Sequence, residues 1–253
     1  DRLVLVVGPA GAGKTRMLQA AVSDLHAQTR AVVGLAPTAK AARVLETETG
    51  MLADTVAKLL YELDHPNPDR SWWDCGPGTT VIVDEAGMLN TSDLHRLVVH
   101  AEQRQWRLAL VGDPHQLQAV GRGGMFMELC DTGRRVELEH LHRFINRWEA
   151  AASLELRNGN PSVIDTYAAH GRIRPGTFDE HLDTIADMWT QCQAAGESLS
   201  IITTRTEHVN AINDHIQQRR LATGRAVQTA GAAQRAGIGI FGHPAGRGPG
   251  AGA

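Results

Sequence analysis

One segment combines a flexible glycine-rich backbone with a lysine and a hydroxyl group at fixed spacing: it reads GPAGAGKT and runs from Gly8 to Thr15. The spacing GxxxxGK[ST] is typical of a loop whose backbone N–H groups point inward at phosphate oxygens. In such a loop the lysine reaches the β- and γ-phosphates of a nucleoside triphosphate, and the hydroxyl ligates Mg²⁺. The residues predicted to bind the triphosphate are Gly8, Pro9, Ala10, Gly11, Ala12, Gly13, Lys14 and Thr15.

The alternative interpretation of this segment is a glycine-rich turn that arose by chance. The flanking sequence argues against it, because an unbroken apolar run from Leu3 to Val7 precedes the loop and apolar residues at helical spacing follow it. A strand before the loop and a helix after it are the setting that this chemistry requires. The helix also adds the positive end of its dipole.

A second apolar run ends in two carboxylates, Asp84 and Glu85, within the sequence VIVDEAG. Because the run has the character of a buried strand, we expect Asp84 at the carboxyl edge of the sheet, beside the phosphate loop. There Asp84 would hold Mg²⁺, directly or through water, and Glu85 would orient and deprotonate the attacking water. The alternative is a solvated strand end, and the nearby phosphate loop favours the catalytic interpretation. A glutamate that activates water also indicates a hydrolase rather than a kinase.

A third apolar run, from Arg107 to Val111, leads into the sequence GDPHQ, which contains Asp113 and Gln116. A glutamine at this edge of the sheet can hydrogen-bond the γ-phosphate or the attacking water, and so sense whether hydrolysis has occurred. The alternative is a turn built from glycine, aspartate and proline.

Strands that alternate with helices must position these motifs. Apolar runs predict strands at residues 3–7, 31–35, 80–83 and 107–111, and helical spacing predicts a helix after each of the first three. This alternation predicts an α/β fold with a mostly parallel sheet and helices on both faces. Residues 64–78 are rich in turn-forming residues and predict an exposed loop.

The second half of the chain has a different pattern. Residues 136–141 and 199–203 are candidate strands, and each is followed by a segment of helical periodicity. From about Thr223 the sequence is rich in Gly, Ala, Pro and Arg and cannot bury enough apolar surface to offset the entropy of ordering. We therefore expect domains at residues 1–134 and 135–222, and a disordered low-complexity tail at 223–253.

Composition sets few limits. The chain has 253 residues, 42% of them hydrophobic, and a net charge of −3, which argues neither for nor against a nucleic-acid partner. Three widely spaced cysteines without a CxxC pair indicate reduced thiols in a cytoplasmic protein. The 12 histidines show no metal-binding spacing, and no apolar run is long enough to span a bilayer.

The three sheet-edge motifs, in this order, resemble those of superfamily 1 DNA helicases, above all the RecD-like branch and the helicase part of conjugative relaxases of the TraA/TraI type. GPAGAGKT is similar to motif I, VIVDEAGML to motif II and VGDPHQLQAVGRGG to motif III. LAPTAKAARVL, from Leu35 to Leu45, is similar to motif Ia, and LEHLHRF, from Leu138 to Phe144, to the start of motif IV. The likeness covers about residues 3–220 and is weaker beyond Arg143.

The resemblance implies a P-loop NTPase of RecA-like fold with an incomplete second RecA-like domain, ATP and Mg²⁺ as cofactors, and 5′-to-3′ movement on single-stranded DNA. It implies that Thr38, Lys40 and Arg43 contact the DNA backbone and that Arg143 reaches the γ-phosphate. Without it, the first three equally fit a solvated helix face, and Arg143 a surface arginine. The resulting site has Glu85, Gln116 and Arg143 as catalytic residues, with Thr15 and Asp84 on the metal.

Further motifs of such helicases are expected outside the part of the sequence that matches. Motifs V and VI would lie beyond residue 220, where the sequence becomes low in complexity, and the adenine-reading motif would lie upstream of residue 1. A relaxase domain would belong to a longer parent chain. Two hypotheses remain open: an ATP-dependent DNA helicase motor domain acting in conjugation, and a nucleotide-binding remnant or interaction module without motor activity. A nucleotide kinase would explain neither Glu85 nor residues 112–116.

Overall fold

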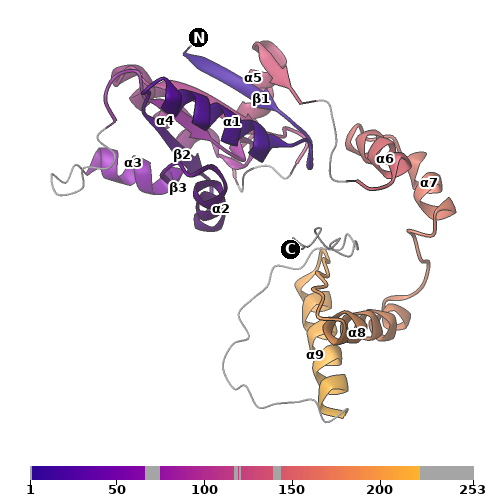
Figure 1. Ribbon diagram of the computed structural model, residues 1–253. Helices are drawn as coiled ribbons and strands as arrows, with labels where there is room; N and C mark the ends of the chain where they lie inside the picture. Colours follow the sequence, from indigo (N-terminus) through magenta and orange to yellow (C-terminus); the bar gives the residue numbers. More distant parts are fainter. Residues whose placement is uncertain (1, 66–74, 117–118, 120, 139–143, 223–253) are drawn as a thin grey trace, which may run out of the picture. The chain divides into compact units, whose positions relative to one another are not determined.

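The chain forms two compact units in the computed structural model, Asp1–His170 and Gly171–Ala253. The structure describes residues 2–65, 75–116, 119, 121–138 and 144–222, drawn as coloured ribbon in Figure 1. The tail predicted at residues 223–253 and much of the loop predicted at 64–78 lie outside the described residues.

The first unit is built on a parallel sheet of six strands in the order β3-β2-β4-β5-β1-β6. Because parallel strands all point the same way, the loops that follow them collect at one edge, where α/β proteins bind their ligands. The strands are β1 (Leu3–Val7), β2 (Val32–Ala36), β3 (Ala53–Thr55), β4 (Thr80–Val83), β5 (Arg107–Gly112) and β6 (Arg135–Glu137).

Helices cover both faces of this sheet (Figure 1). Side chains alternate across a strand, so Leu5 and Val7 enter one core cluster while Val6 enters the other, and Ile82 lies opposite its two neighbours in the same way. Continuous apolar runs are therefore required, and the predicted α/β fold is confirmed. One cluster is completed by α3 (Val56–Asp64), α4 (Thr91–Gln103) and α5 (Met125–Thr132), the other by α1 (Lys14–Ala27) and α2 (Ala39–Thr49).

The first unit continues past the sheet with α6 (Arg147–Arg157) and α7 (Val163–Ala169). Trp148 joins these helices: its ring stacks on His170 with centroids 3.7 Å apart and meets Tyr167 edge-on at 5.7 Å. β6 pairs with β1, so residues 135–137 belong to the sheet. The division of the chain into RecA-like domains at residues 1–134 and 135–222 stays a prediction.

The second unit contains α8 (Phe178–Ala194) and α9 (Thr206–Ala222). Arg219 on α9 pairs with Asp183 on α8 at 2.8 Å, and His215 contacts the same carboxylate at 2.9 Å. The strand predicted at residues 199–203 is wrong, because these residues are irregular in the structure. A strand must pair its backbone groups with a neighbour, and the described part of this unit offers none.

None of the helices in the described ranges combines the length and the apolar character needed to cross a membrane.

Candidate nucleotide-binding site

The predicted phosphate loop follows β1 and is anchored to the neighbouring strand. The Gly8 N–H donates to the Gly112 carbonyl at 3.1 Å, and the Ala12 N–H donates to the Pro9 carbonyl at 3.1 Å, which closes a turn. Gly11 and Gly13 have φ angles of 83° and 82°, a region that side chains other than glycine rarely adopt. These two glycines therefore give the loop the curvature with which successive N–H groups can face one centre.

Helix α1 begins directly behind this loop, and its N-terminus has no side-chain cap. By contrast, α2, α3, α4 and α8 each begin with a threonine or asparagine whose side chain accepts a backbone N–H. The first N–H groups of a helix lack intrahelical partners and carry the positive end of its dipole. The start of α1, which directly follows the glycine-rich loop, is therefore suited to an anion such as phosphate.

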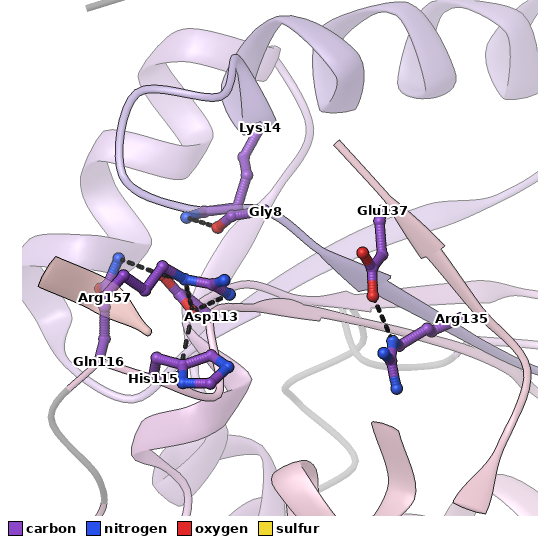
Figure 2. Close-up of polar contacts among 8 residues, drawn as sticks. All are labelled: Gly8, Lys14, Asp113, His115, Gln116, Arg135, Glu137 and Arg157. Carbon is purple, nitrogen blue, oxygen red and sulfur yellow. Dashed lines mark hydrogen bonds and ion pairs between the residues drawn. The ribbon is translucent and has the colours of Figure 1, made fainter. Parts of the chain in front are cut away.

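Lys14 lies across the loop, where its Nζ donates to the Gly8 carbonyl at 2.9 Å (Figure 2). A Cβ at Gly8 would lie 3.2 Å from the Lys14 Cγ and 3.2 Å from the Leu138 side chain, so glycine leaves the lysine room to pass. Thr15, the next residue, is partly exposed in the first turn of α1. The loop residues thus have an arrangement that fits a bound triphosphate, and their contacts with it stay a prediction.

The end of β4 presents Asp84 and Glu85. The Asp84 N–H donates to the Leu35 carbonyl at 2.9 Å, which joins this end to β2, and the Glu85 N–H donates to the Asp84 Oδ1 at 2.9 Å. Burial raises the pKa of Asp84, and the neighbouring Glu85 carboxylate adds to this, while the Glu85 N–H and the Lys14 ammonium oppose it. A partly buried carboxylate whose pKa is raised gains from a nearby cation.

Glu85 itself has a left-handed backbone, with φ 52° and ψ 40°. This conformation costs a residue other than glycine about 1 kcal/mol or more, and such residues cluster at functional sites. The short 3₁₀ helix η2 (Ala86–Met88) follows immediately. The turn at Glu85 thus ends the strand abruptly and holds two carboxylates at the edge of the sheet.

The end of β5 presents Asp113 and Gln116, and here an arginine completes the site. Asp113 is only 4% exposed and accepts from the Arg157 Nη2 at 2.8 Å and from the His115 N–H at 3.1 Å. Burial alone would raise the pKa of Asp113, but the bonds from Arg157 and His115 and the charges of Arg157 and Lys14 outweigh it and lower the pKa. Arg157 lies on α6, and its part in this site was not predicted.

The ends of β4 and β5 lie in close contact. A Cβ at Gly112 would lie 3.2 Å from the Ala86 nitrogen and 3.3 Å from the Gly87 nitrogen, so a side chain there would push η2 and β5 apart by a few tenths of an ångström. The Gly8 N–H bond to the Gly112 carbonyl at 3.1 Å joins the start of the phosphate loop to the end of β5. The three motifs thus meet at one edge of the sheet.

The residues present fit a magnesium ion held mainly by its substrate. Mg²⁺ prefers oxygen ligands and in phosphoryl-transfer sites takes one or two from the protein and the others from phosphates and water. Thr15 and Asp84 would supply a hydroxyl and a carboxylate of this kind. No group of three or more His, Cys, Asp and Glu side chains gathers as a metal site in the described ranges.

The residues predicted to touch nucleic acid follow β2. The Thr38 hydroxyl accepts the Ala41 N–H at 3.2 Å, so it caps α2, while Lys40 and Arg43 are exposed on that helix. Their DNA contacts stay a prediction. Arg143 lies outside the described residues.

Comparison with known proteins agrees with the motif-based resemblance. "Probable conjugal transfer protein TraA" of Sinorhizobium fredii is 39% identical over 174 residues, which are 68% of this chain and 15% of that protein. "ATP-dependent RecD2 DNA helicase" of Deinococcus radiodurans is 34% identical over 149 residues, 56% of this chain and 20% of the relative. "Multifunctional conjugation protein TraI" of Escherichia coli is 33% identical over 135 residues, 50% of this chain and 7% of the relative. The chain therefore spans only a small part of the length of these relatives.

The expected kinship with TraA/TraI-type and RecD-like proteins is confirmed by these relatives. A family model described as "AAA domain" matches residues 1–177, well over half of the chain and the whole of the sheet with its three motifs. The chain belongs to this AAA domain family.

Proposed function

We propose that the chain is the ATP-binding and ATP-hydrolysing motor domain of a cytoplasmic DNA helicase, which couples hydrolysis to movement along single-stranded DNA in conjugative transfer. One observation carries the proposal: the uncapped start of α1, Lys14 and the ends of β4 and β5 meet at one edge of the sheet. The relatives support the biological setting, since two are named as conjugation proteins and one as an ATP-dependent DNA helicase. A relaxase domain would lie on the same parent chain.

In this proposal the loop binds the triphosphate first. Backbone N–H groups from Gly8 to Thr15 and the start of α1 surround the β- and γ-phosphates. Lys14 exchanges its bond with the Gly8 carbonyl for the phosphate oxygens, which it can do because Nζ has three donors and a flexible stem. Binding therefore uses side chains that already lie at the mouth of the loop.

Hydrolysis then uses the two strand ends. Thr15 and Asp84 would hold Mg²⁺, which when bound neutralises charge on the β- and γ-phosphates. Glu85 takes a proton from the attacking water. The water oxygen then bonds to the γ-phosphorus as the bond from that phosphorus to the β–γ bridging oxygen breaks, and ADP leaves with the bridging oxygen. Gln116 orients the water or the γ-phosphate, and Arg143 adds positive charge to the transferred group.

DNA would bind beside this site. Thr38, Lys40 and Arg43 follow β2, which pairs with β4 in the sheet. The Asp84 N–H donates to the Leu35 carbonyl at 2.9 Å, and Thr38 follows Leu35 by three residues. The proposed metal-binding end of β4 is therefore joined to β2 just before the proposed DNA-binding segment begins. Backbone phosphate contacts of this kind position a strand without reading its sequence.

The test is phosphate release from ATP and Mg²⁺, with and without single-stranded DNA. We expect hydrolysis by the wild type that rises with DNA, and a loss of about 100-fold or more in Lys14→Ala, as is usual when a charge-stabilising donor is removed. Lys40→Ala is the matched control: it removes an exposed lysine from α2 and should keep hydrolysis without DNA while weakening the stimulation.

Nucleotide binding without turnover would contradict the motor and leave a nucleotide-binding module. Turnover that is insensitive to DNA would contradict the DNA part of the proposal alone.

A further inference from the structure

Side chains from two separate parts of the chain converge on Asp113 (Figure 2). The Arg157 guanidinium donates through Nη2 at 2.8 Å and Nε at 3.2 Å to Oδ1, with Nε also 3.3 Å from Oδ2. The amide of Gln116 donates from Nε2 to Oδ2 at 3.4 Å. Arg157 lies 44 residues further along the chain, so this contact ties α6 to the end of β5.

The ion pair is well shielded from solvent. The Asp113 side chain is 2% exposed and that of Arg157 is 22% exposed. An arginine that presents two nitrogens of its rigid fork to one carboxylate fixes the carboxylate in direction as well as in charge. Asp113 is therefore held as an ionised group, and an ionised carboxylate can only accept hydrogen bonds.

The ionised Asp113 determines which end of the Gln116 amide faces it. A glutamine amide has one accepting and one donating end, and a neighbour that only accepts selects the donating end. The amide NH₂ of Gln116 is therefore turned toward Asp113, which leaves the carbonyl Oε1 facing away from the carboxylate. An accepting oxygen there can bond an attacking water, while the second N–H of the amide can reach a phosphate oxygen.

The phosphate loop lies next to this arrangement. The Gly8 N–H donates to the carbonyl of Gly112, the residue before Asp113, at 3.1 Å. The Lys14 charge also acts on the Asp113 carboxylate. Gln116 is thus attached to the same strand end that anchors the start of the loop.

We propose that Arg157 is a positioning residue for ATP hydrolysis: by pairing with Asp113 it fixes the direction in which Gln116 presents its amide to the γ-phosphate and the attacking water. The inference rests on the proposed function and deepens it. Arg157 does not touch the substrate; it acts through Asp113 and Gln116.

The test is a double-mutant cycle between Arg157→Met and Gln116→Ala, read as kcat and KM for ATP. Misplacing a reacting group by about 1 Å costs on the order of 100-fold in rate, so Arg157→Met should lower kcat by roughly 10- to 100-fold and change KM much less than kcat. In the Gln116→Ala background the same change should have almost no further effect, because the group that Arg157 positions is already absent. Arg147→Met, an exposed arginine on the same helix, is the control and should leave kcat unchanged.

Two results would overturn the inference. Unchanged kcat in Arg157→Met is one, and losses that simply multiply in the double variant are the other, because they would show that the two residues act independently. Should Arg157→Met fail to fold, Asp113→Asn with Arg157→Met replaces the pair by neutral groups. This double variant should fold and still show the low kcat, whereas wild-type kcat in it would refute the role of the pair.

A second measurement separates this inference from the proposed function. A wild-type chain that binds ATPγS and ADP but does not hydrolyse ATP would refute the motor only. The same cycle is then read as the ratio of ATPγS to ADP affinity, since Gln116 faces the γ-phosphate that ADP lacks. We expect Arg157→Met to lower that ratio only when Gln116 is present; an unaltered ratio would refute the positioning role.

Discussion

The ends of β4 and β5 each carry an aspartate, and the pKa values of the two are shifted in opposite directions. Burial raises the pKa of Asp84, and its charge has no ion-pair partner among the described residues; Asp113 is more deeply buried, yet Arg157 holds its pKa low. A carboxylate that is not neutralised by its own protein is suited to an incoming cation, whereas a neutralised one is suited to hold other side chains in place. We propose from this difference that the end of β4 binds the metal ion and the end of β5 positions other side chains.

Glu85→Gln should have the largest effect on turnover. The amide keeps the size of the side chain but cannot take a proton from water, so we expect kcat to fall by about 10²- to 10⁴-fold while nucleotide binding persists. Phosphate release and a fluorescent-nucleotide titration measure the two quantities. Equal loss in Gln116→Ala and Glu85→Gln would show that the two strand ends do not differ in role.

Arg157→Met should have the largest effect on stability. It leaves the Asp113 carboxylate buried without its cation, and breaking a buried pair by removing one partner costs about 3–5 kcal/mol. Urea unfolding followed by circular dichroism measures the change. Arg147→Met, on the exposed face of α6, should shift stability by less than about 0.5 kcal/mol. Similar unfolding midpoints for the two variants would mean that the Asp113 pair does not stabilise this unit.

Asp84→Asn should stabilise the protein, whereas Arg157→Met should destabilise it. The amide removes a charge that burial disfavours and can still accept the Glu85 N–H, so in the absence of Mg²⁺ and nucleotide we expect the protein to gain about 0.5–2 kcal/mol at neutral pH. The same urea series tests this. A loss of stability in Asp84→Asn would remove the contrast between the two strands.

The smallest effect is the pH dependence of the Asp113 contribution. The pKa of Asp113 is lower in the folded state than its ordinary value near 3.8. The stability that Asp113 supplies is therefore fully present at pH values above that ordinary pKa, and it is lost as the pH falls through the lower pKa of the folded state. The gap in unfolding free energy between the wild type and Asp113→Asn should thus stay constant from about pH 7 to pH 5 and close below about pH 4. A gap that widens on acidification would reverse the sign assigned to this group.

The sequence predicted most strands of the sheet, and the strand before and the helix after the glycine-rich loop, because these depend on local patterns. The run from Leu3 to Val7 and the spacing from Gly8 to Thr15 each lie within one strand or one turn, so neighbours along the chain determine them. The three-residue strand Ala53–Thr55 was missed because it is too short to show a period. Residues 199–203 failed as a strand because pairing depends on neighbours far along the chain.

The electrostatic contrast at the site could not be predicted in the same way. Asp84 and Asp113 both follow apolar runs, and nothing local distinguishes Asp84, which has no ion-pair partner in the described ranges, from Asp113, which is neutralised by an arginine. The distinction depends on Arg157, 44 residues beyond Asp113 on a helix whose own periodicity gives no sign of this contact. Glu85 was predicted as a site residue from its type and position in the sequence, but its left-handed backbone was seen only in the structure.

The magnesium dependence of ATPγS binding tests the division between the two strand ends most directly. Affinities of the wild type, Asp84→Asn and Arg157→Met would be measured by calorimetry with Mg²⁺ and with EDTA. We expect Mg²⁺ to tighten binding by the wild type and by Arg157→Met, and to have almost no effect on Asp84→Asn, whose affinity in EDTA should match or exceed that of the wild type. Full magnesium dependence in Asp84→Asn, or its loss in Arg157→Met, would contradict the account.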